Sequence, residues 1–161
     1  MMKNGFGFLA AAALCCGSAQ AATLQFSPAS RTIAPGASAD VAIVVSGLGA
    51  GAAPSLGAYD FNVTYDAGIL SLGAITFGDP SLGSQLALST PSFRQTDTAV
   101  AGIARLVEVS LDSISIVDAQ QAGQFTLAVL SFDALTPGVS SLGFDTVTIG
   151  DAAANALPAT L

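Results

Sequence analysis

The chain has 161 residues, a net charge of −7 and eleven acidic against four basic side chains. It contains no histidine, which excludes Ser-His-Asp and Cys-His nucleophilic schemes and histidine-ligated zinc or copper sites. An acidic surface with so few basic residues repels phosphate groups, so nucleic acid and anionic membrane surfaces are poor partners.

The N-terminus has the pattern of a secretory signal peptide over residues 1–21. Lys3 supplies the positive charge, an apolar run extends over residues 6–16, and Ala19-Gln20-Ala21 has the small-x-small pattern of a cleavage site. This run is too short to cross a bilayer, which takes roughly 20 residues. We therefore predict cleavage before Ala22, secretion to the periplasm or the outside of the cell, no membrane insertion, and one mature domain over residues 22–161.

Cleavage at this point would also change the chemistry that the mature chain offers. Lys3 and the cysteines Cys15 and Cys16 all lie in the removed segment. The mature domain then has no cysteine, so packing alone holds it together without disulfides. Its three arginines stand against eleven acidic side chains, and the net charge becomes −8.

The mature sequence predicts an all-β fold. Alternating or β-branched runs bounded by glycine and proline are typical of half-buried strands. In chain order, the strands expected are 24–26, 40–46, 59–65, 69–77, 84–88, 106–112, 125–134, 140–144 and 146–149, with one or two helical turns in 116–122. The run 125–132 is either buried on both faces or contains a bulge. About nine short strands at this spacing predict a β-sandwich.

Two of these strands alternate regularly enough for their faces to be assigned. In 59–65 the apolar face holds Tyr59, Phe61, Val63 and Tyr65, and in 106–112 it holds Val107, Val109 and Leu111. If the two strands pair, the opposite face is one acidic patch, formed by Asp60, Asn62, Thr64, Glu108, Ser110 and Asp112. These six residues are the candidates for partner binding. The alternative is that they are only the solvated side of a sheet.

Catalysis, metals and cofactors find little support. Asp79 and Asp151 each bring a single carboxylate to a Gly-Asp turn, so we expect them to cap those turns rather than bind calcium. The mature chain has one glutamate and no marked pair of carboxylates for glycoside hydrolysis. No enzyme activity, metal or cofactor is predicted. A flat aromatic platform for sugars is disfavoured, since Phe93 is the one phenylalanine of the mature chain outside an apolar stripe. Binding of a glycan through polar side chains remains open.

Three segments resemble the cohesin family. Residues 56–66, Leu-Gly-Ala-Tyr-Asp-Phe-Asn-Val-Thr-Tyr-Asp, followed by Ile69-Leu70, look like that family's strand of the form x-Asp-Phe-x-hydrophobic-x-Tyr-Asp with its turn and aliphatic pair. Residues 123–132 are similar to the family's penultimate core strands, and 150–157 resemble its late loop. The three occur in the family's order, and the likeness extends from about Thr23 to Leu161.

The resemblance implies a nine-stranded jelly-roll sandwich of the type shared with carbohydrate-binding modules. It also implies a function, because cohesins hold calcium-carrying dockerin modules, typically in assemblies that degrade polysaccharides, through a sheet of strands 8, 3, 6 and 5. Asp60 matches the aspartate that bonds a dockerin helix, whereas Ala58 replaces an expected polar residue.

Two alternatives remain open beside the cohesin-like function. One is a carbohydrate-binding module that contacts polysaccharide directly. The other is a surface or matrix protein that self-associates. The final strand is expected either to be abbreviated, from Leu157 on, or to be cut short by truncation of the sequence. Either case would leave an open edge on the first strand, around 23–27.

Overall fold

The computed structural model describes residues 21–161, so the expected signal peptide lies outside the described residues except for Ala21. The elements are, in order, β1 (Ala22–Ser27), β2 (Ser38–Ser46), β3 (Leu56–Thr64), β4 (Leu70–Phe77), β5 (Phe93–Asp97), β6 (Ile103–Val109), α1 (Ile114–Gln120), β7 (Phe125–Ala134), β8 (Gly143–Asp151) and β9 (Ala159–Thr160). None of the helices within this part of the chain is long and apolar enough to cross a bilayer.

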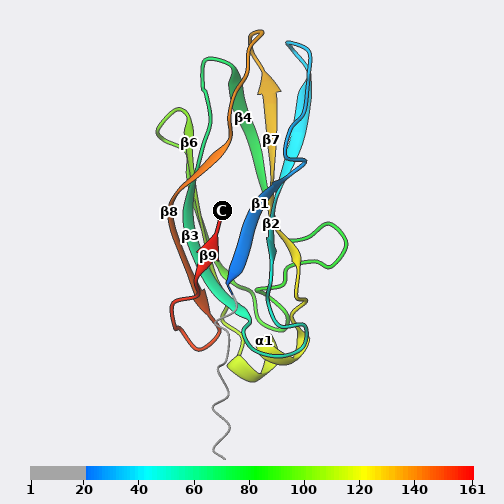
Figure 1. Cartoon of the computed structure of the whole chain (residues 1–161), viewed down its shortest axis with the longest axis vertical. Helices are drawn as coiled ribbons and strands as arrows, with labels where there is room; N and C mark the ends of the chain where they lie inside the picture. The colour runs from blue at the N-terminus through cyan, green and yellow to red at the C-terminus, as the bar shows by residue number, and fades with distance from the viewer. Residues whose placement is uncertain (1–20) are drawn as a thin grey trace, which may run out of the picture.

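Two sheets pack face to face, with α1 at one end of the molecule (Figure 1). Their strand orders are β4-β7-β2-β1-β9 and β5-β6-β3-β8. Neighbouring strands run antiparallel except β1 and β9, which are parallel. Nine strands in two sheets confirm the predicted all-β jelly-roll sandwich.

The core lies between the sheets and follows the alternation of the sequence. On β3, the side chains of Tyr59, Phe61 and Val63 are at most 1% exposed, as predicted. Each large apolar side chain buried in this way contributes about 1.5–3 kcal/mol. On β7, the residues on either side of Leu127 pair with consecutive residues of β2, which leaves Leu127 as the extra residue of a bulge. This bulge explains the mixed apolar spacing of the strand.

The structure differs from the prediction in three places. Residues 84–88 form a loop rather than a strand, although Leu86 is buried. β5 was not predicted, because all five of its residues are exposed and it has no apolar alternation. The two strands predicted over 140–149 are one strand, β8, with an irregularity near Thr146, whose φ is 53°.

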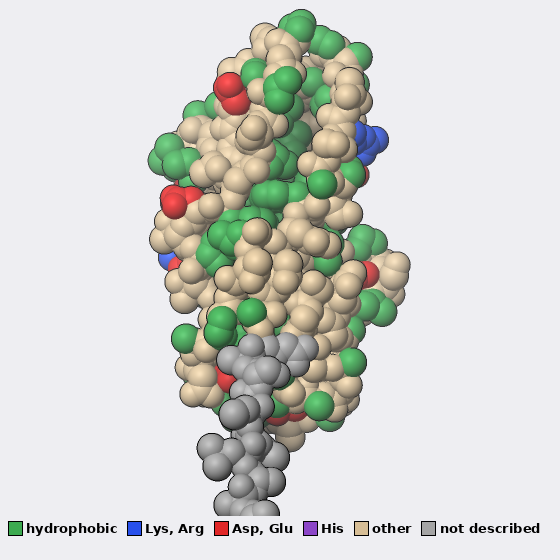
Figure 2. Space-filling model, in the orientation of Figure 1, with side chains coloured by type: hydrophobic (Ala, Val, Ile, Leu, Met, Phe, Trp, Pro, Cys, Tyr) green, Lys and Arg blue, Asp and Glu red, His purple; other side chains and the backbone are tan. Residues whose placement is uncertain are grey.

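One side of the sandwich is only partly closed. β9 pairs with β1 at Ala22 and Thr23, and in the described part of the chain no strand pairs with the outer edge of β1 beyond that point. Hydrophobic side chains gather in a stripe between β8 and β1 on this side (Figure 2). The rings of Phe26 on β1 and Phe144 on β8 stack there, with centroids 4.2 Å apart, and link the two sheets.

Candidate functional site

The predicted polar residues of β3 lie on the outer face of the β5-β6-β3-β8 sheet. Because Tyr59, Phe61 and Val63 point into the core, Asp60 and Asn62 point outward with Thr64, and all three are partly exposed. Thr148 of β8 pairs with Asp60, and Asp145 pairs with Asn62. The orientation predicted for β3 is therefore confirmed.

The orientation predicted for β6 is wrong. Glu108 is 1% exposed and lies on the inner face with Ala104 and Leu106, while Val107 and Val109 point outward. The register explains the inversion, since Glu108 pairs directly with the buried Tyr59, and Leu106 with Phe61. Both faces of β6 carry apolar side chains, so hydropathy alone did not distinguish them. Glu108 is therefore not on the surface that a partner could contact.

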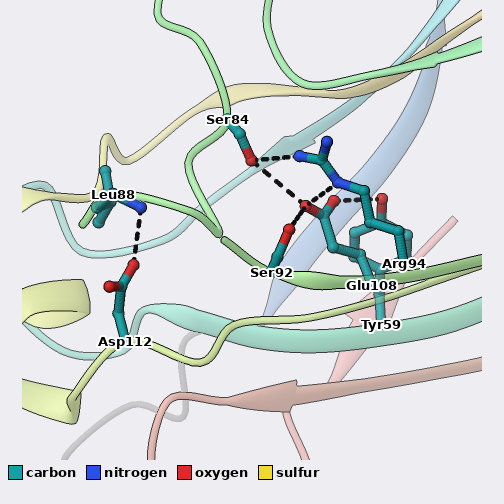
Figure 3. Close-up of polar contacts among 7 residues, drawn as sticks. All are labelled: Tyr59, Ser84, Leu88, Ser92, Arg94, Glu108 and Asp112. Carbon is teal, nitrogen blue, oxygen red and sulfur yellow. Dashed lines mark hydrogen bonds and ion pairs between the residues drawn. The ribbon is translucent and has the colours of Figure 1, made fainter. Parts of the chain in front are cut away.

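Burial of Glu108 is possible because donors surround its carboxylate (Figure 3). Oε2 accepts the Tyr59 hydroxyl at 2.9 Å. Oε1 accepts the Ser92 hydroxyl at 2.7 Å, Nε of Arg94 at 2.8 Å and the Ser84 hydroxyl at 3.3 Å. A buried charge without such partners would be strongly destabilising. Burial of its hydroxyl, with the neighbouring Glu108 carboxylate, raises the pKa of Tyr59 far above its ordinary value.

Glu108 and its four partners, here called the Glu108 cluster, hold the edge strand of the sheet in place. Ser84 and Ser92 belong to the long connection between β4 and β5, and Arg94 belongs to β5 itself. The guanidinium of Arg94 also donates to the Ser84 hydroxyl at 2.7 Å and lies 5.2 Å from the centre of the Phe77 ring. These contacts attach an exposed polar strand to the interior, and Glu108 is therefore structural.

Asp112 and Ser110 are likewise engaged within the chain. The carboxylate of Asp112 accepts the backbone N–H groups of Leu88, Ser89 and Thr90, and the Ser89 hydroxyl at 2.5 Å. Desolvation would raise the pKa of Asp112, but the Ser89 and backbone hydrogen bonds outweigh it and lower the pKa. The Ser110 hydroxyl accepts the N–H of Asp112. The structure thus does not unite the six predicted residues into one acidic patch.

Asp60 faces solvent but is paired with an arginine of the neighbouring strand. Nε and Nη2 of Arg105 donate to Oδ1 and Oδ2 of Asp60 at 2.9 and 2.6 Å, which is the two-pronged geometry of a strong arginine–carboxylate pair. The hydrogen bond from Arg105 lowers the pKa of Asp60, and that of Arg105 is raised in turn. The two side chains are 38% and 48% exposed, so this pair lies at the surface.

The outer face divides into an apolar and a polar end. Phe93 pairs with Val109, which pairs with Ala58, which pairs with Gly150, so one row across four strands is apolar or small. A shallow hollow of about 590 Å³ lies at this end, with Val107 and Val109 among its lining residues. Four residues further along β5, β6 and β3, the row is Asp97, Arg105, Asn62 and Asp145. From the sequence, the two valines were expected in the core and Arg105 was not singled out. Phe93 was noted only as an aromatic residue outside an apolar stripe.

The two turn aspartates behave as predicted. Asp79 accepts the N–H groups of Ser81 and Leu82, and its second oxygen accepts the N–H of Thr126. Asp151 accepts the N–H groups of Ala153 and Asn155. Within residues 21–161, no group of three or more acidic, histidine or cysteine side chains is arranged to hold a metal ion.

Comparison with known proteins gives a consistent picture of the architecture. No family model and no curated protein matches the sequence. Among solved structures, the sixth cohesin of scaffoldin B from Acetivibrio cellulolyticus, in complex with the Cel5 dockerin, matches with a TM-score of 0.67 at 18% identity, over 87% of this chain and 93% of that one. The chain has the cohesin fold.

Other cohesins match over similar lengths. A cohesin from Clostridium acetobutylicum has a TM-score of 0.67 at 17% identity, over 88% of this chain and 86% of that chain. A non-cellulosomal cohesin from Archaeoglobus fulgidus has a TM-score of 0.62 at 15% identity, over 87% and 85% of the two chains. The recognition of a cohesin-like domain is thereby confirmed at the level of fold.

Proposed function

We propose that this chain is a secreted, non-catalytic cohesin-like module that binds a dockerin-type protein, in an assembly linked to polysaccharide degradation. The observation that supports the proposal most is the cohesin fold, whose β5-β6-β3-β8 sheet has exposed and partly exposed side chains on its outer face. Solved cohesins of this fold are in complex with dockerins. Calcium would belong to the dockerin, and the chain itself would need no cofactor.

Partners within the chain support a binding rather than a catalytic role for five of the eleven carboxylates. Asp79, Asp112 and Asp151 hold backbone N–H groups, Glu108 is buried, and Asp60 is paired with Arg105. A pair of free carboxylates across a cleft, as glycoside hydrolysis requires, is not among these.

Calorimetry of residues 22–161 against the dockerins encoded in the same genome, in calcium, tests this proposal. We expect one or more dockerins to bind and chelation of calcium to abolish binding, because the metal holds the partner's fold. Ala58→Arg places a bulky charge on the outer face of β3 and should block binding. Ala42→Arg, on the outer face of β2 in the other sheet, is the matched control. Lack of binding by every dockerin would overturn the proposal.

Direct binding of polysaccharide is a second candidate, favoured by the ring of Phe93. That ring is 51% exposed on the same outer face. An exposed aromatic ring stacks on sugar rings, although a single ring gives weak binding. Retarded migration in native gels containing polysaccharide, abolished by Phe93→Ser, would support this candidate, and unchanged mobility over a broad set of glycans would dismiss it.

Self-association through the outer edge of β1 is a third candidate. Unpaired N–H and C=O groups on an exposed edge are available to a strand of another chain. Sedimentation at rising concentration would reveal such association, and a strict monomer would exclude it.

A further inference from the structure

On the outer face of the β5-β6-β3-β8 sheet, apolar side chains lie beside the residue that the cohesin resemblance marks, since Val107 pairs directly with Asp60. The resemblance points to Asp60, whose two oxygens both accept hydrogen bonds from Arg105. A partner that used Asp60 would first have to displace a two-pronged, charge-assisted pair. The gain from a new hydrogen bond to Asp60 would therefore be largely offset by the loss of the existing ones.

Among residues 21–161, no ion pair of this kind lies on the outer face at the apolar end. Phe93 is half-exposed beside Val109, and Val107 lies next along β6, all on the outer face. Apolar side chains gathered on a surface are typical of interaction sites. A partner that covers them gains free energy in proportion to the apolar area removed from water. Aromatic side chains in such places dominate binding in many interfaces.

The opposite end of the face has an excess of negative charge. Arg105 is the basic side chain in its row, against Asp97 and Asp145 in the same row and Asp60 beside it. Asp97 and Asp145 are both exposed. Charge complementarity therefore favours a partner with basic side chains over this row, which would increase the rate of association and fix the orientation.

The spacing between the two ends suits a helix that lies along the strands. Val109 and Arg105 are four residues apart on β6, which is about 13 Å at about 3.3 Å per residue. An α-helix rises about 1.5 Å per residue, so the same distance takes about nine residues of helix. Since a helix with its side chains is about 10–12 Å wide, it would cover β6 and its neighbours together.

We propose that Phe93, Val107 and Val109 determine the affinity of this face for a helical partner, and that Asp97 and Asp145 orient that partner through basic residues about nine helix positions away. The inference rests on the proposed function, because it specifies the partner for the same face. The cohesin resemblance, by contrast, points to Asp60 as the residue that bonds the partner.

Two probes test the inference. One is any dockerin that binds in the calorimetric screen, and the other is a helical peptide of about 18 residues with leucines along one side and lysines at one end, beside a scrambled peptide and one with glutamates for the lysines. Phe93→Ser should weaken binding about tenfold or more, and Val107→Thr, similar in shape, about threefold. Asp60→Asn should change the dissociation constant less than about threefold. Leu135→Ser is the matched control, because Leu135 is 52% exposed against 51% for Phe93.

The outcomes separate this inference from the proposed function. Binding of the peptide but of no dockerin would leave the inference standing and overturn the dockerin proposal. Dockerin binding that is insensitive to Phe93→Ser, or weakened more by Asp60→Asn, would overturn the inference alone. Equal binding of the lysine and glutamate peptides would overturn the assigned orientation. A dimer or a polysaccharide complex that Phe93→Ser abolishes, with no binding of either helical probe, would assign the face to that occupant instead.

Discussion

Two arginine–carboxylate pairs that share strand β6 have opposite roles in this molecule. Glu108 on β6 is 1% exposed and pairs with Arg94 beneath the sheet, whereas Asp60 on β3 pairs with Arg105 above it. The inner pair is surrounded by further donors from distant parts of the chain, and the outer pair is open to water. Burial, rather than the type of pair, therefore decides whether a charged pair stabilises the fold or stays accessible to a partner.

Of the substitutions considered, Glu108→Ala should lower the free energy of unfolding the most. It leaves the Tyr59 hydroxyl and the Arg94 guanidinium without their acceptor, and breaking a buried pair costs about 3–5 kcal/mol. Arg94 is 35% exposed, so we expect the lower end of that range, about 3 kcal/mol. Urea unfolding followed by circular dichroism measures it.

Glu108→Gln is the matched control for this change, since it keeps the shape and one acceptor oxygen. It should cost about half as much as Glu108→Ala. A loss of less than about 1 kcal/mol on Glu108→Ala would contradict the structural role of the inner pair.

Asp112→Ala should have an intermediate effect. Its carboxylate holds the N–H groups of Leu88, Ser89 and Thr90, so its removal should loosen that loop and cost about 1 kcal/mol. Amide hydrogen exchange at Leu88 and Thr90 should accelerate about tenfold, while exchange within β3 stays unchanged. Uniform acceleration across both segments would instead indicate a global loss of stability.

Asp60→Asn should have the smallest effect on the fold and shift the midpoint of urea unfolding by less than about 0.3 M. The pKa of Asp60 is lowered in the folded state, so its contribution to stability is present above the ordinary carboxyl pKa of about 3.9 and disappears as the pH falls through the folded pKa. The variant should therefore lose slightly less stability than the wild type on acidification. An equal loss in both proteins would show that the outer pair contributes nothing to stability.

The sequence predicted those parts of the molecule where one face is apolar and the other polar. Residues 59–64 of β3 alternate strictly, and each of these side chains lies on the expected face. β6 has apolar residues at both parities, so its orientation depends on the pairing of Glu108 with Tyr59, which is a contact between distant residues. β5 has no alternation, because an interior ion pair through Arg94 replaces an apolar face.

The candidate site was misread for the same reason. On β6, Glu108 was expected at the surface and the valines in the core, as the average behaviour of these residue types suggests. A buried glutamate reverses that expectation only when donors are supplied from elsewhere, here from Ser84, Ser92 and Arg94. The spacing along β6 contains no information about those donors. The turn aspartates, by contrast, bond mainly to nearby residues and were predicted correctly.

The parallel pairing of β1 with β9 brings the two ends of the folded domain to one place. The N–H of Ala22 donates to the carbonyl of Pro158 at 2.9 Å, and Thr23 pairs with Thr160. Neighbouring ends of this kind allow a domain to be circularly permuted or inserted into a host protein. A short linker across this point would free an exposed loop elsewhere to become the new beginning of the polypeptide.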